Sequence, residues 1–202
     1  NELAGVKGDA ADRTDKVKAF MGRFVERAFR RPLDDEQRQL YLDRQFADAP
    51  DVDTAVKRIV LLTLKSPRFL YPEFRREKPD GYDVATRLSF TLWDSIPDSP
   101  LLEAAAKGQL NDAAQVARQA ERMLNDARAK AKLAEFFRQW LKVEQVPDVA
   151  KDSQLFPEFN ASIAADLRTS LELMVDDVVW SDSSDFHHCL LYTSPSPRDV
   201  EE

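Results

Sequence analysis

The sequence contains very little of several residue types. Among its 202 residues there are one cysteine, two histidines and five glycines. So few glycines argue against an all-β chain built on tight turns. No apolar run approaches the roughly 18 residues that a membrane-spanning helix needs, so we expect no membrane span. Acidic residues outnumber basic ones by 36 to 29, and the net charge of −7 disfavours binding to the phosphate backbone of nucleic acids.

The only cysteine and both histidines lie together near the end of the chain, as His187, His188 and Cys189. The string from His187 to Asp199 resembles translated sequencing-adapter read-through, which recurs at the ends of unrelated metagenomic proteins. We therefore expect residues 187–202 to be a non-native tail that packs against nothing. One adjacent cluster at a chain end also gives poor tetrahedral geometry for a metal. Deletion of the tail should leave the melting temperature unchanged.

Without this tail the chain has no cysteine and no histidine, which excludes several chemistries. A disulfide, a cysteine nucleophile, a histidine base, a Cys/His zinc site and a covalent haem attachment motif are all absent from residues 1–186. Catalysis would have to use carboxylates, lysine, tyrosine, serine or threonine. No nucleophile–base pair and no glycine-rich phosphate loop is visible, so a non-enzymatic role is favoured without an enzyme being excluded.

Apolar residues recur at helical spacing through the first third of the chain. Residues 1–12 are small and polar, as in a frayed linker, and residues 13–75 predict a unit of three helices. The first helix has apolar positions at 17, 20, 21, 24 and 28 and is stopped by Pro32. Asp34 is a plausible N-cap for the second helix. The third, opened by Asp51 or Asp53 and extending to Leu64, is apolar on most sides, as a central buried helix would be.

Residues 72–81 are charged and contain proline and glycine, which marks the best internal boundary. Residues 82–186 then predict five more helices, with Ser99 and either Asn111 or Asp112 as helix starts. An aromatic stripe near the end of the fourth of these predicts that Trp140 anchors the main core. We therefore predict an all-α fold, a bundle of about eight helices in two packed units.

Several blocks resemble two known families. Residues 24–33, which include Arg30, Arg31 and Pro32 and end in Leu33, resemble the opening of domain of unknown function 1595. Residues 82–98 resemble the start of domain of unknown function 1592. Residues 108–110, 119–124 and 136–141 match later blocks of that second family in the expected order.

The resemblance implies where the protein is located and which domains accompany it, but it implies no activity. Such domains occur in large proteins of planctomycetes and related bacteria, often beside a cytochrome c domain, and are thought to be exported. It therefore implies a periplasmic or extracellular helical module whose partners are neighbouring domains of the same polypeptide. Haem c would belong to those other domains, and we expect no cofactor in this chain. The family has no established activity; the alternative is a fragment of a carboxylate-dependent hydrolase acting on polymers.

Three residues are candidates for a site. Arg87 lies in an otherwise apolar helix and would need a partner if buried, such as Asp83 or Asp94. It serves either in a structural ion pair or in contact with an anionic ligand. Glu172 and Asp176 are four residues apart on one face of the last helix, where paired carboxylates can share a proton or hold a metal, or simply face solvent. Convergence of Arg87 with these two carboxylates on one open pocket would indicate an active site.

Overall fold

The computed structural model describes residues 4–5, 11–71, 79–143, 151–152 and 154–181. Of these residues 73% are helical and none forms a strand, so the predicted all-α fold is confirmed. None of the helices in these ranges has the length and apolar composition needed to cross a membrane. The predicted non-native tail at 187–202 lies outside the described residues. The chain divides into two compact units, Asn1–Asp126 and Ala127–Glu202.

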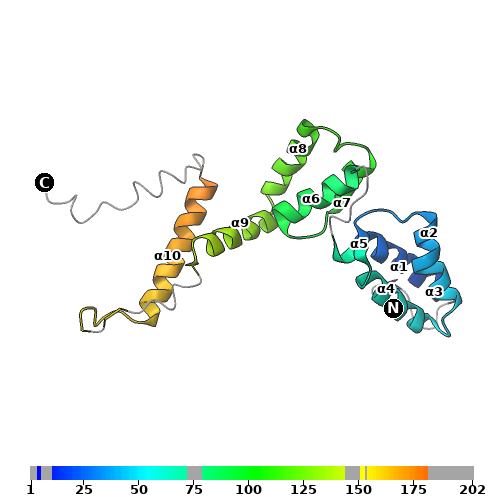
Figure 1. Ribbon diagram of the computed structural model, residues 1–202, viewed down its shortest axis with the longest axis horizontal. Coiled ribbons are helices and arrows are strands. Elements are labelled where there is room, and N and C mark those ends of the chain that lie inside the picture. Colours follow the sequence, from blue (N-terminus) through cyan, green and yellow to red (C-terminus); the bar gives the residue numbers. More distant parts are fainter. Residues whose placement is uncertain (1–3, 6–10, 72–78, 144–150, 153, 182–202) are drawn as a thin grey trace. The chain divides into compact units, whose positions relative to one another are not determined.

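The first unit begins with a bundle of short helices, shown in blue to cyan in Figure 1. Its core lies where one face of the first helix meets the helices that follow. Val17, Met21 and Val25 recur at a spacing of four residues and are almost fully buried, together with Leu42 and Ile59. The elements are α1 (Arg13–Phe29), α2 (Asp35–Arg38), η2 (Gln39–Asp43), α3 (Arg44–Ala47), α4 (Val52–Leu64) and α5 (Pro67–Leu70).

The helix predicted from Asp34 is interrupted by a π-helical segment. It starts as expected, since the Asp34 side chain accepts a hydrogen bond of 2.8 Å from the Gln37 N–H. The segment η2 then separates α2 from α3. A π-helical segment accommodates one extra residue in a helix. Within it Leu42 is buried, whereas Leu40 is 45% exposed.

The prediction that the third helix is buried on most sides is wrong. In α4 only Ala55, Ile59 and Thr63 are buried, while Leu61 and its apolar neighbours at 62 and 64 are exposed. The helix therefore packs through a narrow stripe against α1 and α3. The helix α4 therefore contains more apolar residues than it buries within this bundle.

The remainder of the first unit comprises α6 (Gly81–Trp93), α7 (Ser99–Ala106) and α8 (Ala113–Leu124). The start of α8 at Asp112 is confirmed, because its side chain accepts a hydrogen bond from a backbone N–H of the first turn. The N-cap of α7 is Asp98 and not Ser99. Trp93 is 4% exposed and donates its indole N–H to the Met123 carbonyl at 2.9 Å, so it anchors α6 against α8.

The second unit contains α9 (Ala127–Trp140) and α10 (Ala161–Trp180), which pack against each other. Among the residues of this unit that the structure describes, those that are buried are small or medium-sized: Ala129, Val143, Ala164 and Val175. The larger side chains of both helices are mostly exposed or half-buried. The two compact units divide after Asp126. The sequence, in contrast, predicts a domain boundary at 72–81.

Candidate functional site

A groove of about 810 Å³ lies in the first unit, bordered by α1, α5, α6 and α7. The helix α1 has two apolar faces: one fills the bundle core, and the other presents Phe20 and Phe24 to the groove. Phe69, Tyr82 and Leu102 contribute from the other helices. A hollow of this volume with largely apolar walls is typical of sites that hold small organic ligands.

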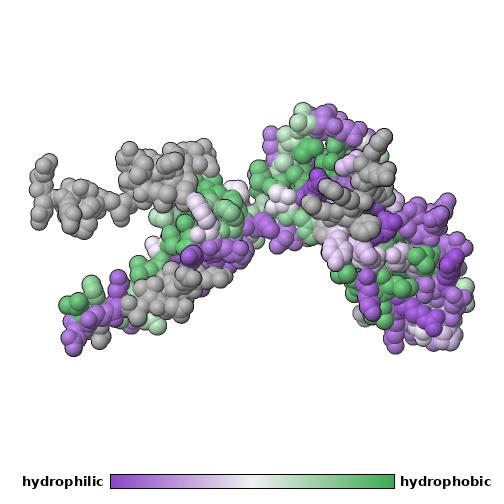
Figure 2. All heavy atoms as spheres, in the orientation of Figure 1, coloured by the Kyte–Doolittle hydropathy of each residue, from purple (hydrophilic) through white to green (hydrophobic). Residues whose placement is uncertain are grey.

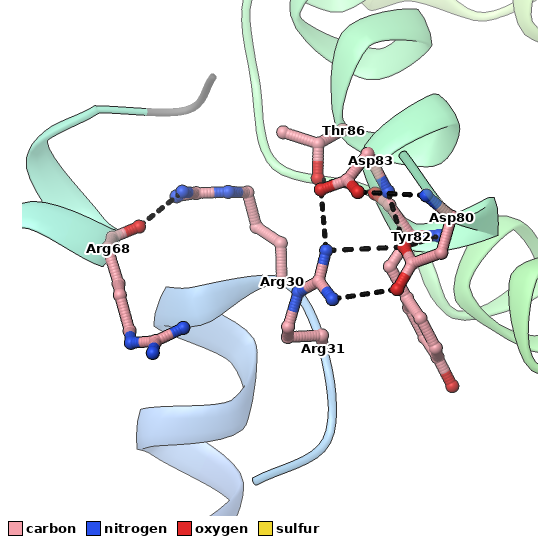
Figure 3. Close-up of polar contacts among 7 residues, drawn as sticks. All are labelled: Arg30, Arg31, Arg68, Asp80, Tyr82, Asp83 and Thr86. Carbon is pink, nitrogen blue, oxygen red and sulfur yellow. Dashed lines mark hydrogen bonds and ion pairs between the residues drawn. The ribbon is translucent and has the colours of Figure 1, made fainter. Parts of the chain in front are cut away.

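A polar cluster beside the groove joins the end of α1 to the start of α6 (Figure 3). The guanidinium of Arg31 donates to the Asp80 carboxylate at 2.9 and 3.3 Å, and to that of Asp83 at 2.6 Å. Asp80 is also the N-cap of α6, in a capping box with Asp83. The Arg31 guanidinium lies over the Tyr82 ring, 5.6 Å from its centroid. One side chain thus fixes the first turn of α6 against α1.

Burial and hydrogen bonding shift the pKa of the Asp80 carboxyl group in opposite directions. Burial alone would raise the pKa of its carboxyl group. The hydrogen bond and charge of Arg31, together with the backbone N–H groups of Tyr82 and Asp83, outweigh burial, so the pKa of Asp80 lies below its ordinary value.

Arg30 holds a different helix from the same corner. It ends α1 in the left-handed conformation, with φ of 60°, and is 4% exposed. Its guanidinium donates to the carbonyl of Ala28 at 3.0 Å and to that of Arg68, in α5, at 2.6 Å. Burial, and then the neighbouring charge of Arg31, lower the pKa of Arg30. Consecutive arginines therefore tie the end of α1 to α5 and to α6, as Figure 3 shows.

This junction was not predicted from the sequence, where Arg30 and Arg31 were considered only as part of the block 24–33. Two local signals point to it. The arginines lie between the end of a helix and Pro32, where basic side chains can donate hydrogen bonds to backbone carbonyls. Asp80 and Asp83 have the spacing of an N-cap and the third helical position. Neither signal predicts that the end of α1 and the start of α6 lie in contact.

The structure does not bury Arg87. It is exposed on α6, and its suggested partner Asp83 binds Arg31 instead. It is not among the side chains that line the groove. The burial on which its need for an ion-pair partner depended is therefore not found.

Glu172 and Asp176 lie on α10 of the second unit and line the same small hollow, of about 170 Å³. The Glu172 carboxylate accepts a hydrogen bond from Arg168 at 3.1 Å and lies 3.9 Å from the Arg138 guanidinium. Asp176 is exposed. Across the described ranges, no three His, Cys, Asp or Glu side chains group as metal ligands would. These contacts describe a partly solvated ion-pair cluster.

The prediction that Trp140 anchors the main core is wrong. Trp140 is 56% exposed and Phe136 is 54% exposed, with their rings stacked at 5.9 Å between centroids. On α10, Leu167 and Leu173 are also exposed. Figure 2 shows hydrophobic side chains on the surface of this unit. We call Phe136, Trp140, Leu167 and Leu173 the exposed apolar set; each of these side chains is more than half exposed, so the set marks apolar surface open to solvent.

Comparison with known families yields two matches in chain order. The family model described as PSD5, protein of unknown function (DUF1595), matches residues 16–73. The model described as PSD4, protein of unknown function (DUF1592), matches residues 80–195, which is more than half of the chain. No curated protein and no solved structure shows significant similarity to it. The first match ends and the second begins within or beside the predicted boundary at 72–81, so Arg31 and Asp80 come from different matched segments.

Proposed function

Since the chain belongs to the DUF1592 family and carries a DUF1595 segment ahead of it, we propose that it is a non-catalytic helical module of a larger exported bacterial protein. The module packs against neighbouring domains of the same polypeptide, in the periplasm or outside the cell. A cytochrome c domain is among those neighbours, and haem c belongs to it. The sequence resemblance supports the setting, and the surface of the second unit supports the packing role.

The observation that carries the packing role is the exposure of Phe136 and Trp140 on α9. Their rings stack at the end of one helix and leave more than half of each side chain exposed. Tryptophan and phenylalanine are enriched in the cores of protein interfaces, because each removes a large apolar area from water on binding. A partner that covers this pair gains that area.

The alternative, a carboxylate-dependent hydrolase, has less support. Its best carboxylate, Glu172, already accepts a hydrogen bond from Arg168, and the hollow beside it measures only about 170 Å³. A polymer chain needs a longer open cleft than this.

The test compares this chain with the longer protein recovered from its full-length gene. In the 202-residue chain, Trp93→Phe and Trp180→Phe leave Trp140 as the only tryptophan. In the longer protein, each tryptophan outside these residues is also replaced by phenylalanine, so that Trp140 alone reports its own exposure. We expect red-shifted emission and ready iodide quenching in the 202-residue chain, and a blue shift with protection in the longer protein. A Phe136→Ser variant should reduce that protection, whereas Leu61→Ser, at an exposed leucine of α4, serves as the matched control. Equal quenching in the short and long proteins would refute the packing role.

A further inference from the structure

The groove of the first unit combines apolar walls with unpartnered positive charge at its rim. Phe20, Phe24 and Phe69 supply aromatic surface, and Leu102 and Ala106 of α7 supply aliphatic surface. Its volume of about 810 Å³ lies within the usual range for sites that enclose a small organic molecule. The walls thus suit the apolar body of a ligand.

Most charged side chains that line the groove already have partners. Arg31 is bound by two aspartates, Glu26 pairs with Arg38 at 3.0 Å, and Glu103 lies 3.5 Å from Lys107. These contacts neutralise the charges that they join. They leave Glu26 and Glu103 less able to repel an anion.

Arg23 and Arg27 differ from the other charged residues of the groove. Both are exposed, both line the groove, and within the part of the chain that the structure describes neither guanidinium makes a hydrogen bond or an ion pair. They are four residues apart on α1, so their side chains extend from the same face of the helix. The whole chain carries a net charge of −7, so this unpartnered positive pair is not a consequence of overall composition.

We propose that the groove binds an amphipathic carboxylate, a small organic acid whose apolar body lies among the aromatic residues and whose carboxylate binds Arg23 and Arg27. A guanidinium can bind both oxygens of a carboxylate, and a charge-assisted hydrogen bond is stronger than a neutral one. The site is separate from the exposed apolar set of the second unit, so this inference does not depend on the proposed packing role.

The test uses decanoate as the probe, below its micelle concentration, and 1-decanol as the uncharged probe of the same length. Calorimetric titration of the 202-residue chain should show decanoate binding that weakens as ionic strength rises, because salt screens the arginines. In the double variant Arg23→Gln, Arg27→Gln, decanoate should bind about tenfold more weakly, with decanol unchanged. The matched control is Arg44→Gln, Arg118→Gln, which removes two exposed arginines that do not line the groove.

A second variant locates the apolar body. Ala106 is exposed on α7 and lines the groove, so Ala106→Phe should fill part of the hollow and weaken the binding of both probes. Circular dichroism checks that each variant keeps its helices. Failure of decanoate to bind the native chain, or equal loss in the Arg44, Arg118 control, would overturn the proposal. Binding that Ala106→Phe leaves unchanged would place the probe elsewhere and overturn it too.

Discussion

Replacement of Arg31 by methionine should destabilise the first unit, because this mostly buried side chain binds two carboxylates. Methionine keeps much of the side-chain volume and removes the guanidinium. Three hydrogen bonds to Asp80 and Asp83 are then lost, and two carboxylates are left beside each other at the start of α6. The capping box of α6 keeps its own hydrogen bonds, so the helix itself should still form.

The magnitude follows from the burial of the three side chains. Arg31 is 13% exposed, and hydrogen bonds to charged groups contribute about 1.5–3 kcal/mol each when buried. The Asp80 and Asp83 side chains are 38% and 21% exposed, so water can replace part of what is lost. Because the bonds share one guanidinium they are not additive. We expect Arg31→Met to lower the free energy of unfolding by about 2–3 kcal/mol.

Urea unfolding followed by Trp93 fluorescence measures this loss, in a Trp140→Phe, Trp180→Phe background. Trp93 is buried in the first unit and therefore reports on it alone. A double-mutant cycle with Asp83→Asn should give a coupling energy of about 1–2 kcal/mol, and Arg31→Lys should recover only part of the stability, because lysine lacks the fork that binds two carboxylates. A loss below about 0.5 kcal/mol, or a coupling energy near zero, would refute the reasoning.

Three further predictions concern the same unit. Trp93→Ala should cost about 3–5 kcal/mol in urea unfolding followed by circular dichroism, because it opens a cavity and leaves the Met123 carbonyl without its indole donor; a cost below about 1.5 kcal/mol would contradict this. Because the pKa of Asp80 is lowered in the folded state, its contribution is present above the unfolded pKa of about 3.9 and is lost as pH falls through the lower folded value. The native chain should therefore lose more stability than Asp80→Asn on acidification below about pH 4, and parallel curves would count against a role for Arg31. Gly108 has a φ of +67°, so Gly108→Ala should cost about 1 kcal/mol, whereas an unchanged melting temperature would show that the turn relaxes.

The placement of the helices could be predicted from the sequence because it depends on neighbouring residues. The 3.6-residue period identifies α1, and the caps at Asp34 and Asp112 lie where short polar side chains precede apolar runs. Each of these signals extends over a few residues. They could be read correctly from the sequence because none of them depends on a contact between residues far apart in the chain.

The burial of particular side chains could not be predicted in the same way. An apolar stripe shows which face of a helix avoids water, but not whether this chain supplies the cover. Trp140 and Leu61 each belong to an apolar stretch of a helix, yet both side chains are exposed to solvent. The pairing of Arg31 with Asp80 joins residues 49 positions apart, a distance over which residue spacing carries no information.

The π-helical segment η2 determines whether a change in the number of residues in its helix also rotates the residues that follow. Each residue of an α-helix turns the following chain by about 100°. Removal of Leu40, whose side chain is 45% exposed, would restore regular α-helical hydrogen bonding and take away no core contact at its own position. Because the π-helical segment absorbs the extra residue, α3 would keep its rotation relative to α2, and Phe46, which packs against the core of the bundle, would stay on the same face. A single-codon deletion at Leu40 would thus be tolerated, whereas a single-codon deletion within the regular turns of α1 would rotate the residues after it by about 100° and damage the core.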